Sequence, residues 1–110
     1  MSPHDRLWEA AKYTVFCSRE EYLATFAGWD IEEGSYGIRV SKGPEFHWLP
    51  CGRLSKAAIR AGIQPLIDAH GYALTRTPDA RQKKFNERIG FYRIGENGDE
   101  TLYRIDTLAF

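Results

Sequence analysis

The chain has 110 residues, 43% of them hydrophobic and 14% aromatic, and its formal net charge is zero. This size and composition predict one folded domain over residues 1–110 with a core of its own, and they argue against a disordered chain. Zero net charge gives no overall electrostatic attraction to nucleic acid or to an anionic membrane.

The charge is nevertheless divided unevenly along the chain. Residues 1–50 carry 5 basic and 8 acidic side chains, a net charge of −3, whereas residues 51–110 carry 10 and 7, a net charge of +3. Four of the basic side chains lie in one segment, 81–88. This segment is either a solvated helix face or a contact for an anionic ligand or partner, and the sequence leaves both interpretations open.

The two cysteines, Cys17 and Cys51, do not have the spacing of metal ligands, and the three histidines are scattered. The sequence therefore predicts no metal site. We expect two small, buried, reduced thiols, with a single disulfide as the alternative.

The N-terminal region, residues 1–34, is predicted to be mainly helical. Asp5 can cap a short helix over residues 6–12. Ser18 and Glu21 have the spacing of a capping box, in which each side chain satisfies a free N–H group at the start of a second helix. An extended link joins the two helices, and a short strand or rim segment ends the region.

The remaining residues, 35–110, are predicted to form a compact α/β fold, a mixed sheet with helices on both faces. Alternating apolar residues predict two antiparallel strands, 36–40 and 45–49, the first of which would leave an exposed edge for another chain. In the second strand, Phe46 and Trp48 share one face.

Small and apolar residues at helical spacing predict a helix over residues 54–70. Pro65 removes one backbone hydrogen bond and clashes with the preceding turn, so together with Gly62 it predicts a break into two shorter helices. A strand follows at 72–77. The order strand, helix, strand implies a parallel pair, and parallel neighbours can separate and leave a cleft.

The end of the chain is predicted to contain one more helix and a closing hairpin. Thr77 as N-cap and Pro78 at the first helical position mark the start of the helix, and Gly90 marks its end. The pair Asn97-Gly98 indicates a two-residue hairpin turn in which both residues adopt positive φ.

Residues 45–105 resemble the C-terminal half of the GNAT N-acetyltransferase superfamily. The resemblance rests on the order of the elements and on a helix that ends in Arg-Ile-Gly-Phe at 88–91, the Lys/Arg-x-Gly-Phe signature, before a final hairpin. It implies a compact GNAT-like fold and, for an active member, acetyl-CoA as the acyl donor.

In this family the loop before the crossover helix is rich in glycine, and its N–H groups hold the coenzyme A pyrophosphate at a helix N-terminus. The matching loop here keeps one glycine and two basic residues but lacks the Gly-x-Gly/Ala pattern. The candidate cofactor-binding residues in it are Gly52, Arg53, Leu54, Ser55, Lys56 and Ala57.

A further departure concerns the proton donor. Counted back from Gly90, Asn86 occupies the position at which many family members carry a tyrosine, proposed to protonate the leaving thiolate. An amide has no proton to give at neutral pH, so catalysis would need another donor or solvent. Asn86 is therefore a candidate for binding the cofactor.

Glu45 and His47 are the candidate catalytic residues. They share the strand face opposite Phe46 and Trp48, and near the cleft they could take the proton of an acceptor amine. A hydrogen-bonded or exposed histidine is the alternative interpretation. Cys51 could act as a nucleophile only beside a base, which the sequence does not indicate.

Three hypotheses for the function follow. The first is a GNAT-like domain with a degenerate catalytic apparatus that acts in binding or assembly, and small proteins of this kind resemble the internal virion proteins of short-tailed phages. The second is an active acyl-CoA-dependent N-acyltransferase. The third is a small regulatory protein that binds a host protein through its acidic N-terminal half.

The chain has no apolar run long enough to span a bilayer, and its N-terminus lacks a signal-peptide core. We therefore expect a cytoplasmic protein without a membrane segment, in the host cytoplasm or packaged in a virion if the protein comes from a phage. The expected partner is a virion or host protein, and the exposed edge at 36–40 would also permit an oligomer.

Overall fold

The computed structural model describes residues 2–50 and 53–110 of the chain. In chain order, the helices and strands within these ranges are α1 (Pro3–Ala11), α2 (Arg19–Thr25), β1 (Asp30–Gly34), β2 (Gly37–Lys42), β3 (Glu45–Leu49), α3 (Lys56–His70), β4 (Ala73–Thr77), α4 (Ala80–Ile89), β5 (Tyr92–Asn97) and β6 (Glu100–Ile105). Among these described helices, none is both long enough and apolar enough to cross a membrane.

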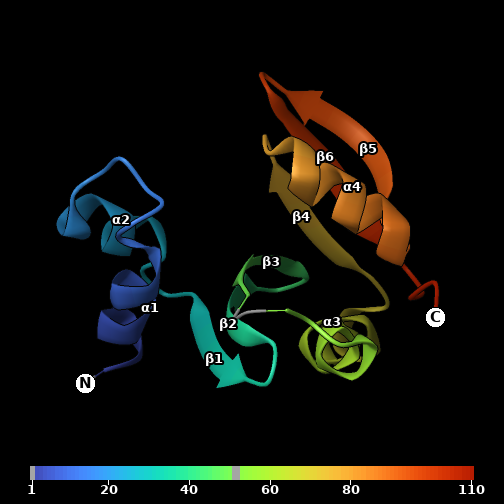
Figure 1. Cartoon of the computed structure of the whole chain (residues 1–110), viewed down its shortest axis with the longest axis horizontal. Helices are drawn as coiled ribbons and strands as arrows, with labels where there is room; N and C mark the ends of the chain where they lie inside the picture. Colours follow the sequence, from blue (N-terminus) through green and yellow to red (C-terminus); the bar gives the residue numbers. More distant parts are fainter. Residues whose placement is uncertain (1, 51–52) are drawn as a thin grey trace.

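The strands form one mixed sheet in the order β1-β2-β3-β4-β6-β5 (Figure 1). β3 and β4 are parallel, and every other neighbouring pair is antiparallel. The predicted α/β fold and the predicted parallel pair on either side of α3 are thereby confirmed.

The sheet begins at Asp30 rather than at residue 35. Because β1 pairs with β2 along its length, the edge expected beside residues 36–40 is not exposed, and β1 and β5 form the two edges instead. The sequence of β1, Asp-Ile-Glu-Glu-Gly, has one large apolar residue. An edge strand that buries little therefore carried only a weak signal.

Helices cover both faces of the sheet. Along β2, Val40 faces α1 and α2 and belongs to a cluster with Leu7 and Phe26. The adjacent Arg39 points to the other face, where its guanidinium donates a hydrogen bond to the carbonyl of Gly62 in α3. Alternation along one strand therefore joins the two layers of helices through the sheet.

The larger part of the core lies between the sheet and helices α3 and α4. Its buried apolar residues are Phe46, Ile59, Ile63, Leu66, Ile67, Ala73, Ile89, Phe91, Tyr103, Ile105 and Leu108. In β6, Thr101, Tyr103 and Ile105 are at most 1% exposed, so every second residue of this strand faces the core.

Helix α3 runs without a break through Pro65, so the prediction of two shorter helices is wrong. Ile63 before Pro65, and Leu66 and Ile67 after it, are all buried against the sheet. Pro65 itself is exposed. Continuous burial of the apolar face outweighs the hydrogen bond that proline removes.

Gly62 does not break α3 either. A Cβ atom at this position would lie 3.2 Å from the Tyr36 ring and 3.3 Å from the Trp48 ring. Glycine therefore lets the helix approach the sheet closely at this point.

Two helix starts differ from their predictions. α1 begins earlier than expected because Ser2 and Asp5 form a capping box. α4 is capped by Asp79, whose carboxylate accepts a hydrogen bond from the Gln82 N–H at 2.8 Å. Thr77 is not the cap, because it still pairs with β6 in the sheet.

The closing hairpin forms as predicted, but its turn lies one residue further on. Asn97 pairs with Glu100, so Gly98 and Asp99 are the turn residues. Of these two, Gly98 has positive φ, at +65°, and Asp99 does not. Glycine at the first turn position is typical of a type II′ turn, which requires positive φ at that position alone.

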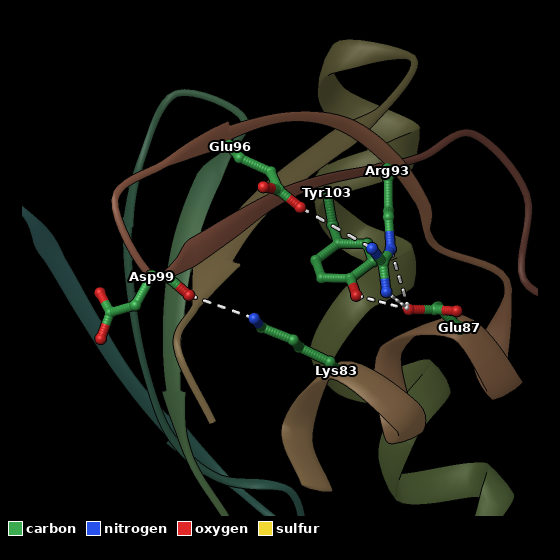
Figure 2. A network of polar contacts seen from close by, with 6 residues as sticks. All are labelled: Lys83, Glu87, Arg93, Glu96, Asp99 and Tyr103. Atoms are coloured by element: carbon green, nitrogen blue, oxygen red, sulfur yellow. Dashed lines mark hydrogen bonds and ion pairs between the residues drawn. The ribbon is translucent and has the colours of Figure 1, made fainter. Parts of the chain in front are cut away.

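Polar side chains attach α4 to the closing hairpin (Figure 2). The hydroxyl of the buried Tyr103 donates to Glu87 Oε2 at 2.6 Å, and the Arg93 guanidinium lies 3.4 Å from the same oxygen. Lys83 Nζ donates to the backbone carbonyl of Asp99 at 3.1 Å. The Tyr103 hydroxyl and the Arg93 charge lower the pKa of Glu87, and burial raises the pKa of Tyr103. The position of α4 is thus fixed by charge as well as by packing.

Replacing Pro65 with alanine should stabilise the protein. Pro65→Ala restores a helical N–H group and removes the ring clash on the exposed side of α3, so we expect the free energy of unfolding to rise by about 1–3 kcal/mol. Urea denaturation followed by circular dichroism measures this change. The neighbouring control Gln64→Ala should shift stability by less than about 0.5 kcal/mol. A less stable Pro65→Ala variant would mean that the packing of α3 requires the proline.

Candidate functional site: a cleft between β3 and β4

Strands β3 and β4 are neighbours in the sheet but pair through a single residue couple, Glu45 with Leu74. Next to it, the Leu74 N–H donates to the carbonyl of Pro44 at 2.9 Å, and the Thr75 hydroxyl donates to the carbonyl of Phe46 at 3.0 Å. Beyond these contacts the two strands diverge (Figure 1). Their facing edges present backbone N–H and C=O groups that a ligand can bind.

A cleft of about 540 Å³ occupies the place where the strands diverge. Residues from both faces of the sheet line it, so it passes from one layer of helices to the other. Towards α1 and α2 it is lined by Leu7, Thr14, Tyr22, Phe26, Val40, His47 and Leu49. Towards α3 and α4 it is lined by Phe46, Trp48, Ile63, Phe85, Asn86, Ile89 and Phe91.

Asn86 is a polar residue buried in the wall of this cleft. It is 2% exposed, and its Oδ1 accepts a hydrogen bond from Gln82 Nε2 at 3.0 Å. Its Nδ2 has no hydrogen-bond partner among the described residues. An unsatisfied buried donor costs about 1–3 kcal/mol. Asn86 is therefore suited to donate a hydrogen bond to an oxygen of a bound ligand.

A second pocket of about 350 Å³ adjoins the cleft along α4. It shares Trp48, Asp79, Gln82 and Phe85 with the cleft, and it adds Pro50, Arg53, Leu54 and Arg81. Arg53 and Arg81 line this pocket just before the start of α3, together with one carboxylate, that of Asp79, which caps α4. Guanidinium groups and the free N–H groups of a helix start both favour an anion.

Two of the predicted cofactor-binding residues, Arg53 and Leu54, line this second pocket. Gly52 lies outside the described residues, as does Cys51. The arginine is placed where an anionic group could be bound.

The rest of the predicted loop belongs to the start of α3. Ser55 is its N-cap, and the hydroxyl accepts a hydrogen bond from the Ala58 N–H at 3.1 Å. Lys56 and Ala57 are exposed and are not among the residues that line either pocket. Their first-turn N–H groups have no partner within the helix itself.

Of the two candidate catalytic residues, His47 lines the part of the cleft beneath α1 and α2, and Glu45 lies beside His47 without lining the cleft. His47 packs against the rings of Phe26 and Trp29, with ring centroids 5.6 Å from each. Glu45 Oε1 lies 3.7 Å from His47 Nε2 and 3.8 Å from Arg76 Nε. Both side chains are on the face of β3 turned towards α1 and α2.

The surroundings of His47 favour its uncharged form. Burial lowers the pKa of His47, and Arg76 acts in the same direction, against the opposing charges of Glu45 and Glu100. A neutral imidazole at pH 7 can accept a proton.

Several residues of the cleft were not predicted from the sequence. Gln82, Phe85 and Ile89 are such residues; together with the predicted Asn86 they have i, i+3, i+4, i+7 spacing, so this face of α4 had a local signal that could have been found. Phe26 had no local sequence signal that would place it in the cleft, because its position there depends on how the N-terminal region packs onto the sheet.

Cys17 is exposed in the link between α1 and α2, so the prediction of a buried thiol there is wrong. A short link without a hydrophobic partner does not bury its side chains. Among the described residues, no group of three or more His, Cys, Asp or Glu side chains is placed to hold a metal ion.

Comparison with known proteins does not identify a family for this chain. No protein-family model, no curated protein sequence and no solved structure matches it significantly.

Burial of His47 predicts a pH-dependent stability. The folded pKa lies below the ordinary value of 6.5, so the unfolded chain binds the proton more readily. The free energy of unfolding should therefore have its highest value above pH 6.5. It should fall as the pH drops through 6.5 and become constant below the pKa of His47 in the folded protein.

Urea unfolding at several values between about pH 5 and pH 8 measures this effect. His47→Gln should remove this component of the pH profile, while His70→Gln, at the exposed end of α3, should keep it. An identical profile for His47→Gln and the unchanged protein would contradict the neutral imidazole.

Proposed function

We propose that the protein is an acyl-CoA-dependent N-acyltransferase with a GNAT-like fold. The observation that carries the proposal is the cleft between β3 and β4, which crosses the sheet between a cationic pocket and an uncharged imidazole. A donor that is long, anionic at one end and reactive at the other suits such a channel.

The resemblance seen in the sequence adds support. Parallel strands flank a crossover helix, the next helix ends at Gly90 and Phe91, and a hairpin closes the sheet. These elements follow one another in the order that the resemblance implies.

Each part of the cleft fits one part of acetyl-CoA. Arg53 and Arg81 can pair with the phosphates, beside the first N–H groups of α3. The free edges of β3 and β4 can bond to the amides of the extended arm, as a strand adds to a sheet. The Asn86 Nδ2 can donate to an oxygen of the arm or of the acyl group.

The residues at the α1 and α2 end supply the base for the transfer. His47 can take the proton of an acceptor amine as the amine nitrogen attacks the acyl carbon, and the Glu45 carboxylate, 3.7 Å away, favours the imidazolium that forms. Backbone N–H groups of the diverging strands can stabilise the charge on the acyl oxygen. Asn86 cannot protonate the thiolate, so solvent supplies that proton.

A GNAT-like domain that binds or assembles without catalysis is the second candidate. Asn86 at the position of the family tyrosine and the glycine-poor loop before α3 favour it. Such a domain would act as a scaffold, as in a phage virion, with a virion or host protein as its partner. The third hypothesis loses support because Leu7 and Phe26 bury the N-terminal region against the sheet.

Isothermal titration of acetyl-CoA at low salt tests the proposal. We expect saturable binding in the micromolar range, and no heat at millimolar ligand would leave only the second candidate. The variant Arg53→Ala/Arg81→Ala should weaken binding by about tenfold or more, because it removes two cations from the pocket.

Lys84→Ala/Arg88→Ala is the matched control, since it removes the same charge from exposed positions of α4 that line neither pocket. It should stay within about twofold of the unchanged protein. Equal losses in the two double variants would show a general charge effect and refute the assigned phosphate site.

Asn86→Leu tests the buried donor separately. Leucine has a similar volume and no polar atom, so thermal stability should be kept or rise by up to about 1 kcal/mol. Acetyl-CoA affinity, measured by the same titration, should fall about tenfold because the ligand loses its hydrogen bond. Unchanged affinity in a folded variant would exclude Asn86 from the binding site.

A further inference from the structure

The end of the cleft beneath α1 and α2 has an apolar and aromatic lining. Leu7, Tyr22, Phe26 and Leu49 line it together with His47. The ring centroids of Tyr22 and Phe26 are 5.3 Å apart, and that of Phe26 is 5.6 Å from the imidazole. An aromatic wall thus stands directly beside the candidate base.

Glu45 and Glu100 are close enough to act on His47, but neither carboxylate lines the cleft. Of the described residues that line the cleft, Asp79 is the one carboxylate, and it caps α4 on the opposite side of the sheet. Glu45, next to His47, is shared with Arg76, whose guanidinium also lines the cleft. A polycation would lose its hydration and meet a like charge instead of carboxylates.

The acidic surface of the N-terminal half does not change this balance. Of its eight carboxylates, four form ion pairs with basic side chains of the same half, Arg6–Glu33, Lys12–Glu9, Arg19–Asp5 and Arg39–Glu32. These pairs leave the net charge at −3, but none of the acidic residues of this half lines the cleft, so this charge gives a polycationic acceptor no carboxylate to pair with inside it.

We propose that the acceptor is a small monoamine with an aromatic body, of the arylalkylamine class, rather than a polyamine, an aminoglycoside or a basic peptide. This inference rests on the proposed function. The ring of the acceptor packs against Tyr22 and Phe26, and its amine lies at His47.

The transfer step balances with these groups. The neutral amine nitrogen forms a C–N bond to the acyl carbon, the C–S bond breaks, and its electron pair leaves with the coenzyme A thiolate. His47 takes one proton from the amine nitrogen, and solvent protonates the thiolate. The products are an N-acylated amine and coenzyme A.

Rates of coenzyme A release from acetyl-CoA, with phenethylamine and with spermidine as acceptors, test the inference. We expect kcat/KM to be at least about tenfold higher for phenethylamine. Thr14→Asp adds a carboxylate to the lining of this end of the cleft. It should reduce the ratio of kcat/KM for phenethylamine to kcat/KM for spermidine. Tyr13→Asp adds the same charge one residue away at a position that is 85% exposed and does not line the cleft, so it should leave the ratio unchanged.

A second measurement separates this inference from the proposed function. Phenethylamine without acetyl-CoA should shift the imidazole NMR signals of His47 saturably, and spermidine should not. Preference for spermidine would refute the acceptor class while leaving the acyltransferase in place. Absence of acetyl-CoA binding together with the phenethylamine shift would refute the acyltransferase and retain the aromatic amine site. If neither acetyl-CoA binding nor the phenethylamine shift is observed, both the acyltransferase and the aromatic amine site are refuted.

Discussion

The single parallel contact between β3 and β4 is the constraint on which the rest of the structure depends. Glu45 and Leu74 join two antiparallel halves, β1 to β3 on one side and β4, β6 and β5 on the other. Each half has its own antiparallel ladders, so the two strands can diverge without disrupting the sheet. Helix α3 connects the two halves of the sheet, and its Ile63 and Leu66 are buried in a core to which both halves contribute. This shared core holds the two halves at a fixed distance and so sets the width of the cleft between β3 and β4.

The chemistry of the cleft follows from alternation along one strand. β3 turns Phe46 and Trp48 towards α3 and α4 and turns His47 towards α1 and α2, so one strand supplies an apolar wall and the candidate base on opposite faces. Covering helices then remove water from both sides. This burial keeps the imidazole neutral, and it leaves the amide of Asn86 with a donor that a ligand can satisfy.

The proposed acyltransferase and the proposed scaffold differ in what they require of this arrangement. A scaffold needs only the packed sheet and helices, for which the Asn86 N–H group, buried without a partner among the described residues, is a cost. A ligand with an anionic end and polar oxygens can accept a hydrogen bond from this group and pair with the exposed Arg53 and Arg81. The cost of burying the Asn86 N–H group without a partner supports the proposal of a bound ligand more strongly than the resemblance does.

The sequence by itself determined the local structure. Short segments of the chain carry this information: Ser18 caps α2, Gly71 ends α3 with positive φ, and residues alternate along β3 and β6. Most helices and strands were predictable from such local patterns. The parallel pair and the face that His47 shares with Glu45 were predictable in the same way. Only the tertiary structure decided that α3 continues through Pro65, that the acidic β1 forms an edge, and that the buried Asn86 Nδ2 has no hydrogen-bond partner among the described residues. These outcomes depend on packing between residues far apart in the chain, and local periodicity carries no information about which distant surfaces meet.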